Sequence, residues 1–160
     1  MNVPQAGPDT PAPAAQACPS PRLWNPNAAA LWSLFFSPIF GAILHMKNWQ
    51  AMGETVKAAE ARQWVVGLSA AMGLLLLLTL FLPMSPAADL ALQLAGLVLL
   101  LAWYYGTGKA QATRVLARYG RGYPRKSWVE PVLIGFAILA GLFVVTVGLG
   151  FLMDLIDTRQ

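Results

Sequence analysis

The chain has 160 residues, of which 57% are hydrophobic and only 11% carry a charge. A soluble domain carries about 25% charged residues. So few charges cannot cover a water-exposed surface, and none of them lies inside the long apolar runs. The composition excludes an ordinary soluble enzyme and a disordered regulator, and the single cysteine excludes an internal disulfide framework. It predicts an all-α integral membrane protein.

The first part of the chain is rich in proline and alanine. Residues 1–23 contain six prolines and two charged side chains. Such a segment cannot bury enough apolar surface to offset the entropy that it loses on ordering. We therefore predict a disordered tail over residues 1–23 and one membrane domain over residues 24–160. Asn25 or Asn27 is the expected cap of the first helix.

The first apolar segment, residues 28–45, is short and contains a proline. A helix needs about 20 residues to cross a bilayer. Ser37-Pro38 lies in the middle of the segment, where proline removes a helical hydrogen bond and kinks the helix. We expect a short, kinked helix that crosses the membrane. A re-entrant hairpin, which returns to the side from which it entered, is the alternative.

Three further apolar segments follow, at residues 64–83, 90–106 and 131–153. Each of them has about the length that a membrane crossing requires. Pro83 and Pro86 separate the first of these segments from the second, because two prolines so close together prevent a helix from continuing. The sequence therefore predicts a bundle of four membrane-embedded helices.

The positive charges predict the orientation of this bundle. Nine of the eleven Lys and Arg residues lie in two connections, residues 47–63 and 107–127. Loops rich in Lys and Arg stay in the cytoplasm. Both connections are therefore expected to be cytoplasmic and to carry amphipathic surface helices, and four crossings place both termini outside. Tryptophans at the cytoplasmic ends of the segments are expected to be interfacial anchors: Trp49, Trp64, Trp103 and Trp128.

The first apolar segment also carries a row of small residues. Ser33, Ser37 and Gly41 follow one another at four-residue spacing beside Pro38, which places them on one face of a continuous helix. Small residues allow a second helix backbone to approach closely. This face is expected either to pack within the bundle or to dock on a partner. A ligand cleft that opens at Pro38 is a third alternative.

The connection 107–127 contains six basic residues and no acidic residue. Each basic residue near an anionic leaflet contributes about 1 kcal/mol to membrane association. Besides setting the orientation, this stretch is expected to bind lipid headgroups or an acidic partner. A nucleic-acid partner is not expected, because the patch is short and lies against the membrane. The residues are Lys109, Arg114, Arg118, Arg121, Arg125 and Lys126.

No pattern in the sequence indicates catalysis. His45 is the only histidine and has no obvious catalytic partner, so we expect it to form an interfacial hydrogen bond. The apolar segments contain no ionisable residue of the kind that marks ion pathways. The prediction is a non-enzymatic protein without a metal or cofactor.

The stretch from residue 24 to residue 53 carries a recognisable pattern: Trp24-Asn25-Pro26, Trp32-Ser33-Leu34, Phe40-Gly41-Ala42 and Asn48-Trp49. It resembles the opening of a family of small, uncharacterised inner-membrane proteins of proteobacteria. The resemblance covers about a third of the chain. It implies a bacterial inner-membrane location and a helical bundle, and it implies no particular chemistry.

The function that we predict is that of an accessory subunit, which acts through the small-residue face and the basic connection. Its expected partners are the anionic bilayer and either another membrane protein or further copies of the chain. Two alternatives stay open. One is an immunity protein that protects the membrane from a toxin. The other is an oligomeric channel or small-solute carrier, lined by Ser69, Thr79, Gln93 and Thr146.

Overall fold

The computed structural model describes residues 20–83 and 85–158, and the regular elements in this part are helices. The predicted all-α class is confirmed. Most of the predicted disordered tail, including Cys18, lies outside the described residues. In chain order the elements are α1 (Pro26–Phe36), α2 (Pro38–Ala51), α3 (Thr55–Phe81), α4 (Pro86–Trp103), the π-helical turn η1 (Tyr104–Gly108), α5 (Lys109–Tyr119) and α6 (Val129–Asp157).

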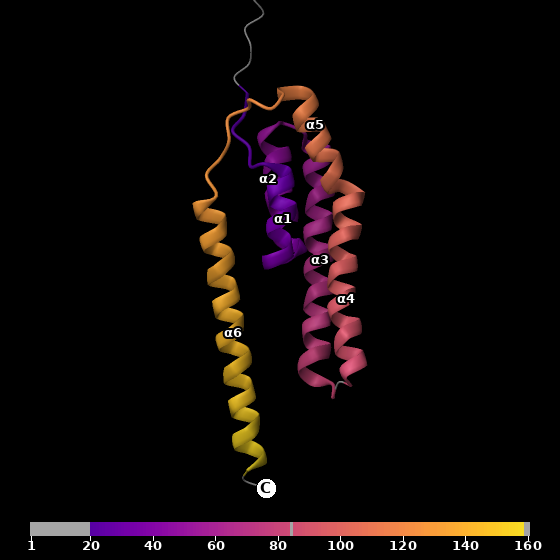
Figure 1. Ribbon diagram of the computed structural model, residues 1–160, viewed down its shortest axis with the longest axis vertical. Coiled ribbons are helices and arrows are strands. Elements are labelled where there is room, and N and C mark those ends of the chain that lie inside the picture. The colour runs from indigo at the N-terminus through magenta and orange to yellow at the C-terminus, as the bar shows by residue number, and fades with distance from the viewer. Residues whose placement is uncertain (1–19, 84, 159–160) are drawn as a thin grey trace, which may run out of the picture.

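The first apolar segment forms two helices, α1 and α2, that lie side by side as a hairpin (Figure 1). The side chain of Asn25 caps α1, as expected, and Pro26 occupies the first turn, where no backbone donor is needed. The chain reverses at Ser37, whose φ of +155° lies outside the helical region. Pro38 explains the reversal, because it disfavours a helical conformation in the residue before it and cannot donate to the preceding turn.

This hairpin corrects the crossing that we expected for residues 28–45. The backbone N–H of Trp24, just before α1, donates to Oδ1 of Asn48, near the end of α2, over 3.0 Å. The two ends of the hairpin therefore meet at the same end of the molecule. The re-entrant alternative describes the structure, and the kinked crossing helix does not.

The connection 47–63 is not a separate surface helix either. Helix α2 continues to Ala51, the chain turns at Gly53 with a φ of +74°, and α3 begins at Thr55. A positive φ of this size favours glycine, which has no Cβ to clash with the backbone. Most of the predicted amphipathic helix is thus the last turn of α2 and the first turns of α3.

Helices α4 and α5 form one continuous rod through η1, from Pro86 to Tyr119. The rod ends at Gly120, whose φ of +68° is typical of the residue that terminates a helix. Within α5, Ala112 and Val115 are buried whereas Arg114 is exposed. This part of the connection 107–127 is therefore amphipathic, as the sequence predicts.

Three described helices are long and apolar enough to cross a membrane: α3, the α4–α5 rod and α6. Only 6%, 11% and 6% of the residues in their most apolar stretches are buried. Extended apolar surface of this kind indicates contact with lipid rather than water. The protein is a multi-pass membrane protein, and the predicted segments 64–83, 90–106 and 131–153 lie largely within these helices.

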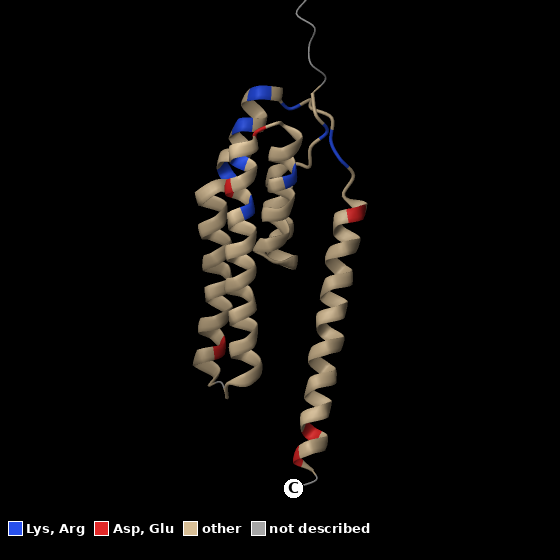
Figure 2. Ribbon diagram, turned by 180° about the vertical axis from the view of Figure 1, so that it is seen from behind, with Lys and Arg blue, Asp and Glu red and all other residues tan. Residues whose placement is uncertain are grey.

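The two ends of the described chain lie at opposite ends of the molecule, which corrects the expectation that both termini share a side (Figure 1). Leu23 is fully buried, and its backbone exchanges hydrogen bonds with the carbonyl of Pro124 (3.1 Å) and the amide of Lys126 (3.0 Å). Leu23, which we assigned to the tail, is thus part of the folded domain. The Lys and Arg residues that the structure describes gather at this same end, which we call the basic end (Figure 2).

Two of the four predicted interfacial tryptophans belong to the core instead. Trp49 is 5% exposed and packs with the core of the basic end, and Trp103 is 1% exposed and packs between the hairpin and α3. Trp64 and Trp128 are half-buried at the edges of such clusters. Tryptophan is amphipathic, so the end of a membrane helix suits it whether it faces lipid or protein.

Candidate functional site

Buried polar side chains join three parts of the chain at the basic end. These parts are α2, α5 and residues 20–25 before α1, which we call the N-terminal segment. Asn48 accepts the Trp24 N–H at Oδ1 and donates from Nδ2 to the Trp24 carbonyl over 2.8 Å. The same Nδ2 donates to Oε1 of Gln111 over 3.3 Å, and Gln111 Nε2 donates to the His45 carbonyl over 2.8 Å. His45 Nε2 donates to the Pro26 carbonyl over 3.1 Å, since a carbonyl oxygen only accepts. We call Asn48, Gln111 and His45 the buried polar network.

The protonation of His45 makes the stability of this network depend on pH. His45 lies outside the three candidate spans, and burial lowers its pKa from 6.5 to about 4, although the hydrogen bond to Pro26 acts in the opposite direction. The unfolded chain therefore takes up a proton below pH 6.5 that the folded chain refuses until about pH 4. This contribution to stability is complete above pH 6.5 and is lost as the pH falls towards 4.

We expect the free energy of unfolding to fall by roughly 2 kcal/mol more in the native protein than in a His45→Gln variant when the pH is lowered from about 7 to about 4.5. Glutamine retains a hydrogen-bond donor but does not titrate. Unfolding titrations in detergent micelles at the two pH values measure the difference. The two proteins differ in no other titratable side chain, so parallel pH dependences would contradict the assignment to His45.

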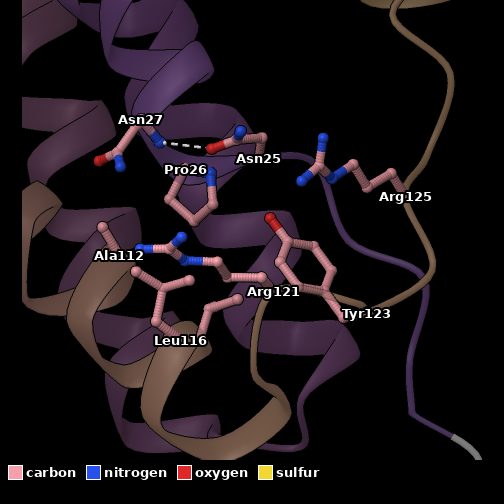
Figure 3. Close-up of a pocket in the computed structure, with 9 residues that line it drawn as sticks. Asn25, Pro26, Asn27, Ala112, Leu116, Arg121, Tyr123 and Arg125 are labelled. Atoms are coloured by element: carbon pink, nitrogen blue, oxygen red, sulfur yellow. Dashed lines mark hydrogen bonds between the residues drawn. The ribbon is translucent and has the colours of Figure 1, made fainter.

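A pocket of about 290 Å³ opens at the basic end, between the start of α1, α5 and the loop that follows α5 (Figure 3). Arg121 and Arg125 both line it, and the Arg125 guanidinium lies 5.7 Å from the centre of the Tyr123 ring. Burial raises the pKa of Tyr123 above its usual value despite the neighbouring Arg125. We call this the arginine pocket. Its remaining lining residues are Asn25, Pro26, Asn27, Ala112, Val115 and Leu116.

The six basic residues predicted to bind headgroups or an acidic partner do not form one surface. Arg114 and Arg118 both bind Oε1 of Glu54, over 3.0 and 3.2 Å. The ammonium group of Lys126 lies 4.2 Å from the centre of the Trp24 ring. Lys109 is exposed at the start of α5. Of the six, Arg121 and Arg125 alone line the arginine pocket.

The predicted small-residue face is divided by the hairpin. Ser33 on α1 and Gly41 on α2 are both buried, and a Cβ on Gly41 would overlap the Ser33 hydroxyl. Ser37 and Pro38 lie at the reversal between the two helices. The three small residues therefore do not share one helix face, and two of them pack against each other inside the protein. Their place in the structure fits the packing alternative.

Sequence reasoning missed two residues of the site. Gln111 is fully buried, and its only signal was its position four residues before Val115, on the apolar stripe of α5. Trp24 contributes its backbone to the buried polar network and its ring to Lys126. In the sequence it was visible as the first residue of the Trp24-Asn25-Pro26 pattern, but without either of these two roles.

The hydroxyl groups proposed for a channel lining form hydrogen bonds within their own helices. Ser69, Thr79 and Thr146 each donate to a carbonyl four residues earlier in their own helix, over 2.7, 2.9 and 3.0 Å. Within residues 20–83 and 85–158, no group of three His, Cys, Asp or Glu side chains comes together as a metal site requires.

No protein family, curated protein or solved structure matches the chain significantly. The resemblance to small inner-membrane proteins of proteobacteria therefore stays a prediction.

Proposed function

We propose that this protein is a non-enzymatic accessory subunit of a bacterial inner membrane, and that its arginine pocket binds an acidic segment of a membrane partner. The observation that carries the proposal is a pocket with two arginines and no acidic lining residue among those described. By the positive-inside rule, the basic end lies in the cytoplasm. The acidic segment would then be a cytoplasmic loop or tail of the partner.

The pairing of the arginines distinguishes the pocket from the rest of the basic end. Arg114 and Arg118 share Glu54, whereas within the described part of the chain Arg121 and Arg125 form no ion pair with a carboxylate. A guanidinium group presents a planar fork of donors that matches a carboxylate. Two unpaired arginines beside one pocket are therefore suited to a Glu or Asp side chain from outside.

The small-residue face, which is the other surface predicted to bind a partner, is already used inside the protein. The Ser33–Gly41 contact closes the hairpin of the protein itself, so this pair is not free to dock on a partner. The long helices expose mainly apolar side chains to the membrane. Polar recognition of a partner therefore falls to the basic end.

The proposal predicts that the double substitution Arg121→Gln and Arg125→Gln reduces recovery of the partner in mild detergent roughly tenfold, because two exposed arginine–carboxylate pairs of up to about 1 kcal/mol each are lost. The matched control is Arg62→Gln with Lys109→Gln, which removes two exposed positive charges outside the pocket. Quantitative mass spectrometry of the co-purified proteins, at equal expression, gives the comparison. Equal partner recovery from the two double variants would contradict the proposal.

A further inference from the structure

A second and larger cavity lies deeper in the membrane region, between the hairpin, α3 and α6. Its volume is about 560 Å³. The lining is almost entirely apolar, with Phe40 and Ile43 from α2, Met72 and Gly73 from α3, and Ile138 and Leu142 from α6. We call it the α3–α6 cleft, and it shares no lining residue with the arginine pocket.

The cleft exists because α6 stands apart from the other two long helices (Figure 1). Near its start, α6 packs against the tip of α1, where the rings of Phe36 and Phe136 meet edge to face at 5.2 Å. The Phe36 ring also lies against Gly135, so closely that a Cβ there would lie 2.8 Å from it. The hairpin is shorter than α3 and α6, so it separates them without filling the space between them.

Two lysines converge on one tryptophan beside the cleft. Lys47 lines the cleft, and its ammonium group lies 5.9 Å from the centre of the Trp24 ring. Lys126 lies 4.2 Å from the same ring. Trp24 Nε1 donates to the Ser127 carbonyl over 2.9 Å, which holds the ring at the start of α6. Neither lysine forms an ion pair with a carboxylate in the part of the chain that the structure describes.

We propose that the α3–α6 cleft binds one acyl chain of an anionic phospholipid, with the lipid phosphate at Lys47 and Lys126. A lysine ammonium group is a common phosphate ligand, and tryptophan commonly lies at the level of the lipid headgroups. The apolar lining below the lysines then holds the chain. The cation pair and the apolar cleft together match a ligand that is anionic at one end and apolar along its length.

The volume decides between a lipid chain and a helix from another protein. A transmembrane helix about 10 Å across and about 30 Å long fills roughly 2,000 Å³ or more. The cleft volume of about 560 Å³ lies within the usual range for small-molecule sites, and the cleft is too small for a complete helix. A single lipid chain is therefore the occupant that fits.

Lipid retention by the purified full-length protein tests the proposal. The probes are phosphatidylglycerol and phosphatidylcholine with identical chains, and native mass spectrometry reads the bound lipid. The native protein is expected to prefer phosphatidylglycerol roughly tenfold or more, and the variant Lys47→Gln with Lys126→Gln should lose that preference. Excess inorganic phosphate should leave phosphatidylglycerol bound, because free phosphate lacks the chain that the cleft holds.

A second pair of variants tests the cleft independently of the charges. Gly73 lines the cleft and Gly148 does not, and a Cβ on either residue would meet nothing within 4 Å. Gly73→Phe should therefore fill the cleft and reduce retention of both lipids, while Gly148→Phe should retain the native level. Any one of three results would overturn the proposal. The lysine variant could keep the headgroup preference, inorganic phosphate could displace the lipid, or the two glycine variants could retain equal amounts of lipid.

Discussion

Replacing Asn48 with alanine is expected to lower the free energy of unfolding by about 3 kcal/mol and to release the N-terminal segment from α2. The Asn48 side chain is fully buried and serves the N–H and the carbonyl of Trp24 together with the Gln111 amide. Alanine leaves these groups without that partner in a site that water does not reach. Each buried polar group left unpaired costs about 1–3 kcal/mol.

Two measurements check this result, with Gln50→Ala as the control. Gln50 is an exposed amide on the same helix, so its removal should change stability by less than about 0.5 kcal/mol. Unfolding in mixed micelles gives the free energies. Trypsin cleavage after Arg22, beside the buried Leu23, should become about a hundredfold faster in Asn48→Ala, because cleavage follows the population of the opened segment. Similar cleavage rates in the two variants would contradict the role of Asn48.

The same substitution should disturb both proposed binding sites. Trp24, whose backbone Asn48 holds, carries the ring that Lys47 and Lys126 share. Two residues further along, Pro26 lines the arginine pocket and accepts the His45 hydrogen bond. The buried polar network therefore supports the arginine pocket and the lysine pair through one short segment of backbone.

The long helices could be predicted from the sequence because their signal is local. A run of apolar residues without charges defines α3 and α6 whatever the rest of the chain does. The end of the α4–α5 rod at Gly120 is also local, since it depends on a residue that tolerates a positive φ. The positions of these long helices along the chain were therefore accessible without any knowledge of tertiary contacts.

The hairpin could not be predicted in the same way, because residues 28–45 suit both of the topologies that we considered. Proline at position 38 is compatible with a kink and with a reversal. The structure shows a reversal, and the contacts that accompany it join residues distant in sequence, such as Trp24 with Asn48. A local pattern carries no information about such a pair. The same limit explains why Trp49 and Trp103 were assigned to the interface rather than to the core.

The candidate site shows the same difference between local patterns and long-range contacts. The six basic residues of the connection 107–127 are visible in the sequence, and the structure places them at one end of the molecule. Which of them are already paired depends on Glu54, which lies 60 residues before Arg114 and 64 before Arg118. The sequence predicted where positive charge lies, but not which arginines are left unpaired.

Gly41→Ala is expected to destabilise the protein by about 3 kcal/mol, in contrast to the usual effect of this change in a helix. Alanine has the higher helix propensity, by about 1 kcal/mol. At Gly41, however, the added Cβ would overlap the Ser33 hydroxyl and lie 2.6 Å from a ring carbon of Trp103. Trp103 is 1% exposed and cannot swing aside without moving its neighbours. Overpacking of this kind costs about 1–3 kcal/mol, and α1 would have to move away from α2.

Gly148→Ala is the matched control, because a Cβ at Gly148 meets nothing within 4 Å. Its free energy of unfolding, measured in the same micelles, should be unchanged or slightly raised. The comparison also separates two of the three uses that the sequence allowed for the small-residue face, packing within the protein and docking on a partner. If Gly41 packs only against its own chain, Gly41→Ala loses stability in the purified protein without any partner present. If the two alanine variants were equally stable and Gly41→Ala instead lost a co-purifying protein, Gly41 would belong to a docking surface and the packing of the hairpin would be wrong.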